Sequence, residues 1–464
     1  MQIPCQKQAV CDETVILARL LIPGRGDPLP NAAVVVSTAT GKITFVGPQR
    51  DLPQRLCSAP QIRVVCLLPG LWDCHTHFVG ITKVDFPAMI QTHPAICGAA
   101  IARGFYDTLM AGITSVRDVG SFAIEAHVAV KAGLLLGPSV FGAGGCIGIT
   151  GGSSDATTLP LDFVYATQGV HHTKPWPGTS SLVLADGPDE CRRAVRQQIR
   201  RGALCIKVIT TGGVMSTTDN PQYRQYSDAE LEAIMDEAKL QHRAVAAHAH
   251  GTAGIVAAIK AGATTIEHGS YLTKEAVELM KCRGTTLVAT RHIIEAGLRM
   301  LDTWPAPTAA KMVAVANRHL ESYKLAVQAG VKIALGTDIC SSNPTDEISH
   351  GRNATEVVWA VTKAGMTPLG AIEAATANAA ETLGPQTPKK GILQVGWDAD
   401  MIAMDENPLE KIQLFADPRN IKFVWKEGKL VKSPSDCFWP PPLEELCGWN
   451  IVSHTDCAGC GQAH

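Results

Sequence analysis

Two pairs of histidines, each with one residue between its members, follow apolar runs in this chain. The first pair lies in Asp73-Cys-His75-Thr-His77 and the second in Ala247-His248-Ala-His250. Residues two apart in a β-strand project to the same face, so His75 and His77 can share one metal ion, although a pair at the end of an ordinary surface strand would look the same. In the second pair, an imidazole that follows an apolar strand suits a zinc ligand, and a histidine buried in the core is the ordinary alternative.

Three further polar residues interrupt or end apolar runs: His268, Lys207 and Asp338. An imidazole suits zinc, a desolvated lysine has a lowered pKa and could react with CO2 to give a metal-bridging carbamate, and a carboxylate could bind metal or shuttle protons. Each also has an ordinary interpretation: a core histidine, a lysine whose ammonium reaches water, and a helix N-cap.

The elements that must position these residues alternate along the chain. Five times a helical pattern ends in glycine and an apolar or β-branched run follows, at Gly112, Gly202, Gly262, Gly284 and Gly330. Glycine is favoured just past a helix end, and alternating helices and strands indicate a parallel sheet. One intervening helix is predicted to begin at a capping box, Ser227 with Glu230.

Eight strands are expected within residues 69–387 or just before them, at 64–73, 113–118, 139–144, 203–209, 244–248, 264–268, 285–290 and 331–337. Eight parallel strands predict an α/β fold of the (β/α)8 TIM barrel type, in which the chemistry lies at the strand C-termini. The five histidines, Lys207 and Asp338 are placed at or near those ends. A shared functional site explains these seven positions better than seven unrelated ordinary roles do, because unrelated residues would be scattered over both strand ends and the helices.

Both ends of the chain differ from this central region, because they contain short β-branched runs separated by turns. We expect residues 1–68 and 388–432 to form a smaller β-sandwich that flanks a barrel of residues 69–387. Residues 433–464 form a tail with Trp, Pro and four cysteines, in which Cys457-x-x-Cys460 is weak evidence for a separate zinc site.

Composition excludes several classes of protein. Of the 464 residues, 46% are hydrophobic and 18% charged, which favours a large folded core over disorder. The net charge of −2 argues against nucleic-acid binding, and no apolar run approaches the ~20 residues of a membrane helix. Fifteen irregularly spaced cysteines and the absence of a visible signal peptide predict reduced thiols and a cytoplasmic location.

Several of these segments together resemble the amidohydrolase superfamily. They are Pro69-Gly-Leu-Trp-Asp-Cys-His-Thr-His77, Gly112-Ile-Thr-Ser-Val-Arg-Asp118, Ile206-Lys-Val208, Gly212-Gly-Val-Met-Ser216 and Leu335-Gly-Thr-Asp338, with His248 and His268. The likeness extends from about Ile16 to Lys432 and is greatest to the ochratoxinase and prolidase-like metallocarboxypeptidase branch. The resemblance implies a metal-dependent hydrolase of carbon–nitrogen bonds that forms homo-oligomers.

The resemblance also implies a role for each residue. His75 and His77 would hold one zinc ion, His248 and His268 a second, and carboxylated Lys207 would bridge both. Asp338 would contact a metal and shuttle protons, and His250 would contact the substrate. A hydroxide shared by the two metals would attack a small-molecule amide, such as an N-acyl amino acid, a dipeptide or an ochratoxin-like amide.

The chain departs from the pattern of these relatives in one loop, where Ser153 stands in place of a histidine. The long connection 146–186 is either a lid or a solvated insertion, and Tyr223, Tyr226, Tyr271 and Arg291 are candidates to line the pocket. Three other functions stay open: a one-metal deaminase, which has no use for Lys207, a lactam or ester hydrolase, and a non-catalytic binding barrel.

Overall fold

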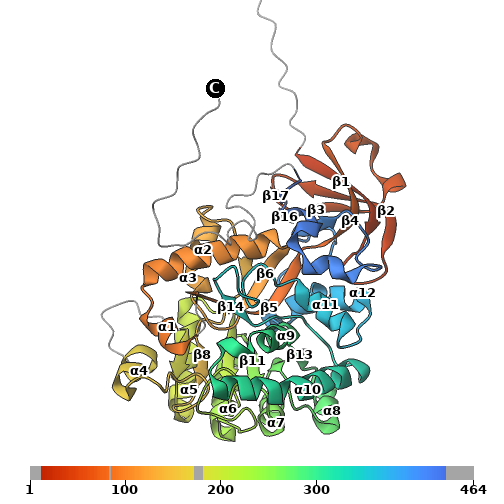
Figure 1. Cartoon of the computed structure of the whole chain (residues 1–464). Coiled ribbons are helices and arrows are strands. Elements are labelled where there is room, and N and C mark those ends of the chain that lie inside the picture. The colour runs from red at the N-terminus through yellow and green to blue at the C-terminus, as the bar shows by residue number, and fades with distance from the viewer. Residues whose placement is uncertain (1–11, 83–84, 172–180, 435–464) are drawn as a thin grey trace, which may run out of the picture.

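The computed structural model describes residues 12–82, 85–171 and 181–434 (Figure 1). Two sheets in it are wholly parallel and a third is mixed. The thirteen helices in this described part are α1 Phe86–Gln91, α2 Pro94–Met110, α3 Ala123–Lys131, α4 Leu161–Gln168, α5 Gly187–Arg201, α6 Asp228–Leu240, α7 Thr252–Ala261, α8 Lys274–Arg283, α9 Arg291–Arg299, α10 Ala306–Gln328, α11 Thr355–Thr362, α12 Pro368–Ala374 and α13 Ala377–Glu381. The α/β class is confirmed.

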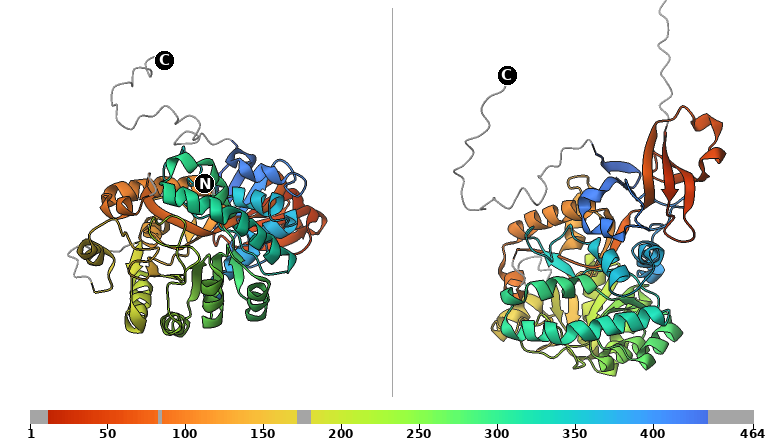
Figure 2. Two further views of the ribbon diagram at one scale, coloured as in Figure 1. Left: turned by 60° about the horizontal axis from the view of Figure 1, so that its bottom comes forward. Right: turned by 45° about the vertical axis from the view of Figure 1, so that its right-hand side comes forward.

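The central region contains the two parallel sheets. The larger has the order β13 Thr286–Val288, β12 Thr265–His268, β11 Ala244–Ala249, β10 Cys205–Ile209, β8 Cys146–Gly148 and β9 Leu182–Leu184. The smaller has the order β14 Ile339–Ser341, β5 Leu71–Ile81, β6 Ile113–Asp118 and β7 Ser139–Val140. Helices α5, α6, α7, α8 and α10 pack outside these strands (Figures 1 and 2).

Backbone hydrogen bonds outside the ladders connect the edges of the two sheets. The Leu204 N–H donates to Gly142 O at 2.9 Å, next to the stretch that holds β7 and β8. On the other side, Leu287 donates to Lys332 O at 2.9 Å, and Cys74 of β5 donates to Leu335 O at 2.9 Å. Residues 332–335 therefore lie between β13 and β5 and bond to both.

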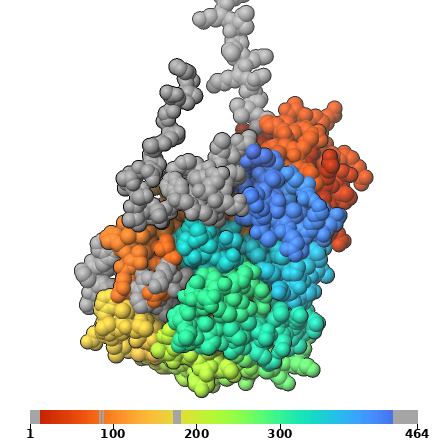
Figure 3. All heavy atoms as spheres, in the orientation of Figure 1, coloured from red at the N-terminus to blue at the C-terminus, as the bar shows by residue number. Residues whose placement is uncertain are grey.

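The two ends of the chain meet in one seven-stranded sheet, β17 Lys429–Lys432, β16 Ile421–Lys426, β15 Met401–Met404, β4 Gln61–Pro69, β1 Glu13–Leu21, β2 Leu29–Ser37 and β3 Ile43–Pro48. Parallel pairing of β1 with β4 and antiparallel pairing of β4 with β15 join the N-terminal and C-terminal strands. The red and blue segments accordingly lie side by side in Figure 3. Residues 435–464, including Cys457-x-x-Cys460, are outside the described residues.

Two predicted strands differ from those observed. The strand predicted at 64–73 is wrong as a single element, because β4 ends at Pro69 and β5 begins at Leu71 in a different sheet. A side chain at the intervening Gly70 would meet the Thr114 side chain at 2.2 Å, so the chain turns there in tight contact. The segment 331–337 carries only an isolated bridge, Leu287 with Ile333, instead of a ladder.

The helix-end predictions are confirmed. Gly202, Gly262 and Gly284 adopt left-handed conformations as C-caps, with φ between 69° and 112°. Ser227 and Glu230 form the predicted capping box at the start of α6. Each of these glycines reverses the chain from a helix toward the next strand, which gives the alternation that builds the parallel sheets.

Two further expectations concern cysteines and membrane spans. The nine cysteines in the described part of the chain are all free thiols, as expected for reduced cysteines. Among the described residues, no helix combines the length and apolar character needed to cross a membrane.

We expect Gly336→Ala to destabilise the protein. A methyl group there would lie 2.7 Å from His75 Cβ and 2.8 Å from the His75 backbone nitrogen, so the backbone of β5 would have to move. Overpacking of this kind costs about 1–3 kcal/mol, which thermal unfolding would report as a fall in Tm. Gly98→Ala in α2 is the matched control, because its methyl group meets nothing within 4 Å. An equal Tm for the two variants would contradict this prediction.

Candidate metal centre and substrate pocket

The seven side chains named from the sequence line one cavity of about 160 Å³ at the C-terminal ends of the strands. They are His75, His77, Lys207, His248, His250, His268 and Asp338. Ligand atoms of His248, His250 and His268 lie within 4.8 Å of one another, and so do those of His75, His268 and Asp338. The fold thus brings together residues that are up to 263 positions apart.

Hydrogen bonds behind His75 and His77 fix which ring nitrogen carries the proton. Nδ1 of His75 lies 2.7 Å from Glu267 Oε2, and Nδ1 of His77 lies 2.9 Å from Gly120 O. Both oxygens can only accept when Glu267 is ionised, so each Nδ1 is protonated and each Nε2 keeps a lone pair. A lone pair is what a metal ion requires of an imidazole.

Hydrogen bonds also assign the free ring nitrogen of the other two candidate ligands, His268 and His248. Thr290 Oγ1 donates to Ala289 O at 2.7 Å and therefore accepts from His268 Nδ1, also at 2.7 Å, which leaves His268 Nε2 free. His248 is reversed, since its Nε2 lies 3.3 Å from Gly212 O and its Nδ1 is the free nitrogen. Burial lowers the pKa of His248 to about 3, so the neutral form persists near pH 7.

Lys207 lies among these imidazoles. Its Nζ is 3.2 Å from His75 Nε2, and only 2% of the residue is exposed. Burial lowers the pKa of the Lys207 amine, although Glu267 and Asp338 act in the opposite direction. A lysine whose ammonium reached water, the ordinary interpretation of the sequence, is therefore contradicted.

Asp338 faces the first histidine pair. Its Oδ1 is 3.1 Å from His77 Nε2 and 3.5 Å from His75 Nε2. Burial raises the pKa of Asp338, but the neighbouring His75, His77 and Lys207 lower it more, so that it falls to about 2. Its backbone has a φ of +65°, and its N–H donates to His75 O at 2.7 Å, which ties it to β5.

The buried carboxylate of Asp73, which the sequence did not single out, joins the segments that carry His75 and Asp338. Asp73 accepts hydrogen bonds from the backbone N–H groups of His75 and Thr337, both at 3.0 Å, and from Asn353 Nδ2 at 2.8 Å. Burial raises the pKa of Asp73 to about 6. Its place two residues before His75, on the same strand, was the available signal.

The rest of the cavity wall is mostly apolar. It includes Ile209, Val214, Met215, Ile293, Ile294 and Met312. Ser153 also lines the cavity, and its Oγ would be 2.2 Å from a methyl group placed on Gly213. The loop that contains Ser153 is therefore in direct contact with the pocket.

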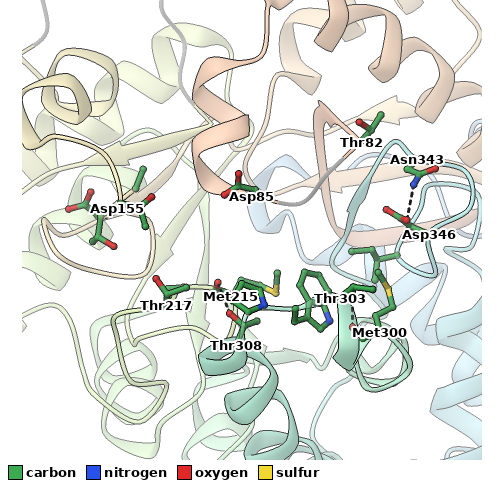
Figure 4. A pocket seen from close by; sticks show the side chains of 17 residues that line it. Thr82, Asp85, Asp155, Met215, Thr217, Met300, Thr303, Thr308, Asn343 and Asp346 are labelled. Atoms are coloured by element: carbon green, nitrogen blue, oxygen red, sulfur yellow. Dashed lines mark hydrogen bonds between the residues drawn. The ribbon is translucent and has the colours of Figure 1, made fainter. Parts of the chain in front are cut away.

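Met215 also lines a second, outer cavity of about 610 Å³. Figure 4 shows its polar wall, which includes Asp85, Asp155, Asp346 and several threonines. Asp155 accepts from the Gly151 N–H at 2.7 Å, and Asp346 accepts from Ser341 Oγ at 2.6 Å. The apolar inner cavity thus adjoins a hydroxyl- and carboxylate-rich outer one.

Four residues that were candidates to line the pocket do not line either of these cavities. Tyr223 is 69% exposed, and the Tyr226 hydroxyl donates to Ala185 O. Arg291 is buried against Glu295, with Nη2 2.6 Å from Glu295 Oε1, and Tyr271 packs in an apolar cluster. Arg291 therefore does not meet a substrate carboxylate in this arrangement.

Known proteins are similar to this chain in sequence and in fold. Residues 66–431 match the amidohydrolase family. The chain is 46% identical over 438 residues to the ochratoxinase of Aspergillus niger, which covers 92% of this chain and 88% of that protein. The crystal structure of the A. niger ochratoxinase superposes with a TM-score of 0.86 over 92% of this chain and 97% of that one, at 46% identity.

Two less similar solved structures are named as enzymes that cleave dipeptides. One is an Xaa-Pro dipeptidase with methionine in its active site, 31% identical with a TM-score of 0.77 over 91% of this chain and all of that one. The other is a prolidase complexed with N-methylphosphonate-L-proline, 30% identical with a TM-score of 0.79 over the same shares.

Proposed function

The chain belongs to the amidohydrolase family, and we propose that it hydrolyses an amide bond in a small-molecule substrate with two divalent metal ions. As a member of this family it is a hydrolase of carbon–nitrogen bonds. The observation that carries the finer proposal is the position of Lys207, whose amine lies 3.2 Å from a candidate metal ligand inside a cavity lined by five histidines.

The architecture that we propose for this function is a closed eight-stranded (β/α)8 barrel. The hydrogen bonds from Leu204 to Gly142 and from Cys74 to Leu335 support closure on both sides. We propose residues 69–387 as the barrel, 1–68 and 388–432 as the two parts of a β-sandwich, and 433–464 as a tail. The break between β4 and β5 at Gly70 supports the first boundary.

The donor atoms fit two metal ions. We propose that His75 and His77 hold one, that His248 and His268 hold the other, and that Lys207, carboxylated by CO2, bridges them with Asp338 as a further ligand. Four imidazole nitrogens are left with lone pairs by their supporting hydrogen bonds, and the set of nitrogen and carboxylate donors favours zinc. Two bound ions would polarise the scissile carbonyl and make water a nucleophile near pH 7.

The chain's own groups supply the remaining steps. Asp338 is ionised near neutral pH, so it can accept the proton of the attacking water and deliver it to the departing nitrogen. His250, whose Nδ1 lies 2.7 Å from Ser270 Oγ, is held in the cavity where it can contact the substrate. The apolar wall excludes water from the group next to the scissile bond.

The substrate class that fits best is an N-acyl amino acid, a dipeptide or an ochratoxin-like amide. The apolar wall of the inner cavity supports a bulky apolar group beside the amide, and the names of the ochratoxinase and the Xaa-Pro dipeptidase agree with it. We further propose that the chain forms a homo-oligomer, as the family resemblance implies. A one-metal deaminase is less favoured, because it leaves Lys207 without a role.

Zinc-loaded protein should release amine from members of a panel of N-acyl amino acids, dipeptides and ochratoxin-type amides. We expect about two zinc ions per chain by elemental analysis, and we expect chelator-treated protein to lose its activity and regain it when zinc returns. One ion per chain with ammonia released from a cyclic amidine would instead support the deaminase. No amine from any amide by the zinc-loaded protein would reject the proposed substrate class.

A further inference from the structure

Two charged residues outside the cavity form a buried chain that ends on a candidate metal ligand. The side chains of Arg117 and Glu267 have no exposed surface, and Arg117 Nη2 lies 2.7 Å from Glu267 Oε1. The second oxygen of the same carboxylate, Oε2, lies 2.7 Å from His75 Nδ1. A guanidinium, a carboxylate and an imidazole are thus joined in series across β6, β12 and β5.

The orientation of the Glu267 carboxylate is fixed from behind. Arg117 also donates through Nε to Cys74 O at 2.7 Å and through Nη1 to Thr265 Oγ1 at 2.9 Å. Thr265 Oγ1 donates in turn to Glu267 Oε1. One oxygen is therefore occupied by Arg117 and Thr265, and the other is directed at His75.

A contribution to folding stability is a weak explanation for the buried ion pair of Arg117 and Glu267. Removing two charges from water is costly, and well-packed apolar residues in place of a buried ion pair are often as stable or more so. The pair does, however, give His75 a support that the other candidate ligands lack. His77 and His248 contact backbone carbonyls, and His268 contacts a hydroxyl, whereas His75 contacts a carboxylate.

We infer that Arg117 and Glu267 are positioning residues that hold the His75 proton on Nδ1 and make the metal position of His75 and His77 the tighter of the two. This inference rests on the proposed function, since it requires two metal ions. A carboxylate behind a histidine fixes the ring orientation and raises its basicity, and loss of such a partner weakens metal binding by about 10–100-fold.

The isosteric variant Glu267→Gln tests this directly. Arg117 can only donate, so it selects the amide oxygen of the new side chain and leaves the amide NH2 facing His75. The NH2 group can only donate, so Nδ1 of His75 must accept and the proton moves to Nε2. Because Nε2 is the nitrogen that would bind the metal, a proton there competes with the metal ion, so the variant should weaken zinc binding by His75 and His77 even though the side chain keeps its shape.

A double variant, Arg117→Met with Glu267→Gln, separates this role from a structural one. Without Arg117 the amide can turn its oxygen toward His75, so the proton can return to Nδ1. We expect the double variant to bind zinc at the affected position more tightly than Glu267→Gln alone, although more weakly than the wild type. A purely structural pair predicts no such recovery of zinc affinity.

Thr290→Val is the matched control, because it removes a neutral support from His268, which belongs to the other proposed position. The experiment is competition for zinc between each protein and a chromophoric chelator, with thermal unfolding to check folding. Glu267→Gln should weaken one of the two sites by about 10–100-fold and spare the other, whereas Thr290→Val should leave that site unchanged.

The outcomes distinguish this inference from the proposed function. A wild-type chain that binds fewer than two zinc ions would reject the proposed function. Two wild-type sites with unchanged affinity in Glu267→Gln, or with both weakened equally, would overturn the inference alone. If Glu267→Gln does not fold, the double variant decides: one weakened site supports the inference, and two sites of wild-type affinity overturn it.

Discussion

Replacing Lys207 by alanine is expected to remove at least one metal ion per chain and to lower the rate of amide hydrolysis by about three orders of magnitude or more. The amine lies 3.2 Å from His75 Nε2 and lines the same cavity as the candidate ligands of both metals, and a free ammonium there would repel two cations. A carbamate on this amine would remove that conflict, because its negative charge is shared by two oxygens that can face the two metals. Elemental analysis and the initial rate of amine release measure the two effects.

Lys432→Met is the matched control for this variant. Lys432 is also a buried lysine, and burial lowers its pKa to about 8. Its Nζ, however, donates to Met110 O and Pro418 O, away from both cavities. The control should keep its zinc and its hydrolysis rate even if its Tm falls. Lys207→Ala with two zinc ions and the wild-type rate would exclude the bridging role.

The residues at the centre were predictable from the sequence because each follows from local rules. His75 and His77 share a strand face through the two-residue period, and Lys207 is conspicuous inside an apolar run. The glycines at helix ends marked where each strand begins, and the structure confirms their left-handed conformations. Those rules act over a few residues, and the sequence displays them directly.

The supports behind the ligands were not predictable in the same way. Glu267 is 192 positions from His75, and Asn353 is 280 positions from Asp73, so neither pairing appears in any local pattern. Only the closing of the fold brings these side chains together. The tautomers of the histidines depend on these partners, and they could not be assigned before the structure.

The error over Arg291 has a different origin. The sequence places Glu295 four residues after Arg291 on a helix, which is the spacing of an intrahelical ion pair. That pair forms, and it directs the guanidinium along α9 instead of into the cavity. The four-residue spacing of Arg291 and Glu295 on a helix therefore indicates the ion pair, whereas the position of Arg291 after a strand does not indicate where its side chain points.

Asp338→Asn is expected to lower kcat for amide substrates by about 10²–10⁴-fold while the protein keeps most of its zinc. The amide oxygen of asparagine could still be directed at a metal ion held by His77, whose Nε2 lies 3.1 Å from Asp338 Oδ1, so the arrangement of ligands around that ion would be preserved. The amide cannot take the proton of the attacking water, however, and so it cannot deliver one to the departing nitrogen. Zinc content, kcat and KM measured on the same preparation separate the two contributions.

The departing group gives a sharper test of this proton transfer. The amine of an alkyl amide must be protonated to leave, whereas a nitrophenyl ester releases nitrophenolate as a stable anion, so only the amide needs a proton from Asp338. Asp338→Asn should therefore slow amide hydrolysis at least tenfold more than hydrolysis of an ester with the same acyl group. Equal losses on both substrates, together with loss of zinc, would mean that Asp338 acts only as a ligand. The ratio of the two losses is unaffected by the fraction of active enzyme, so it isolates the proton transfer.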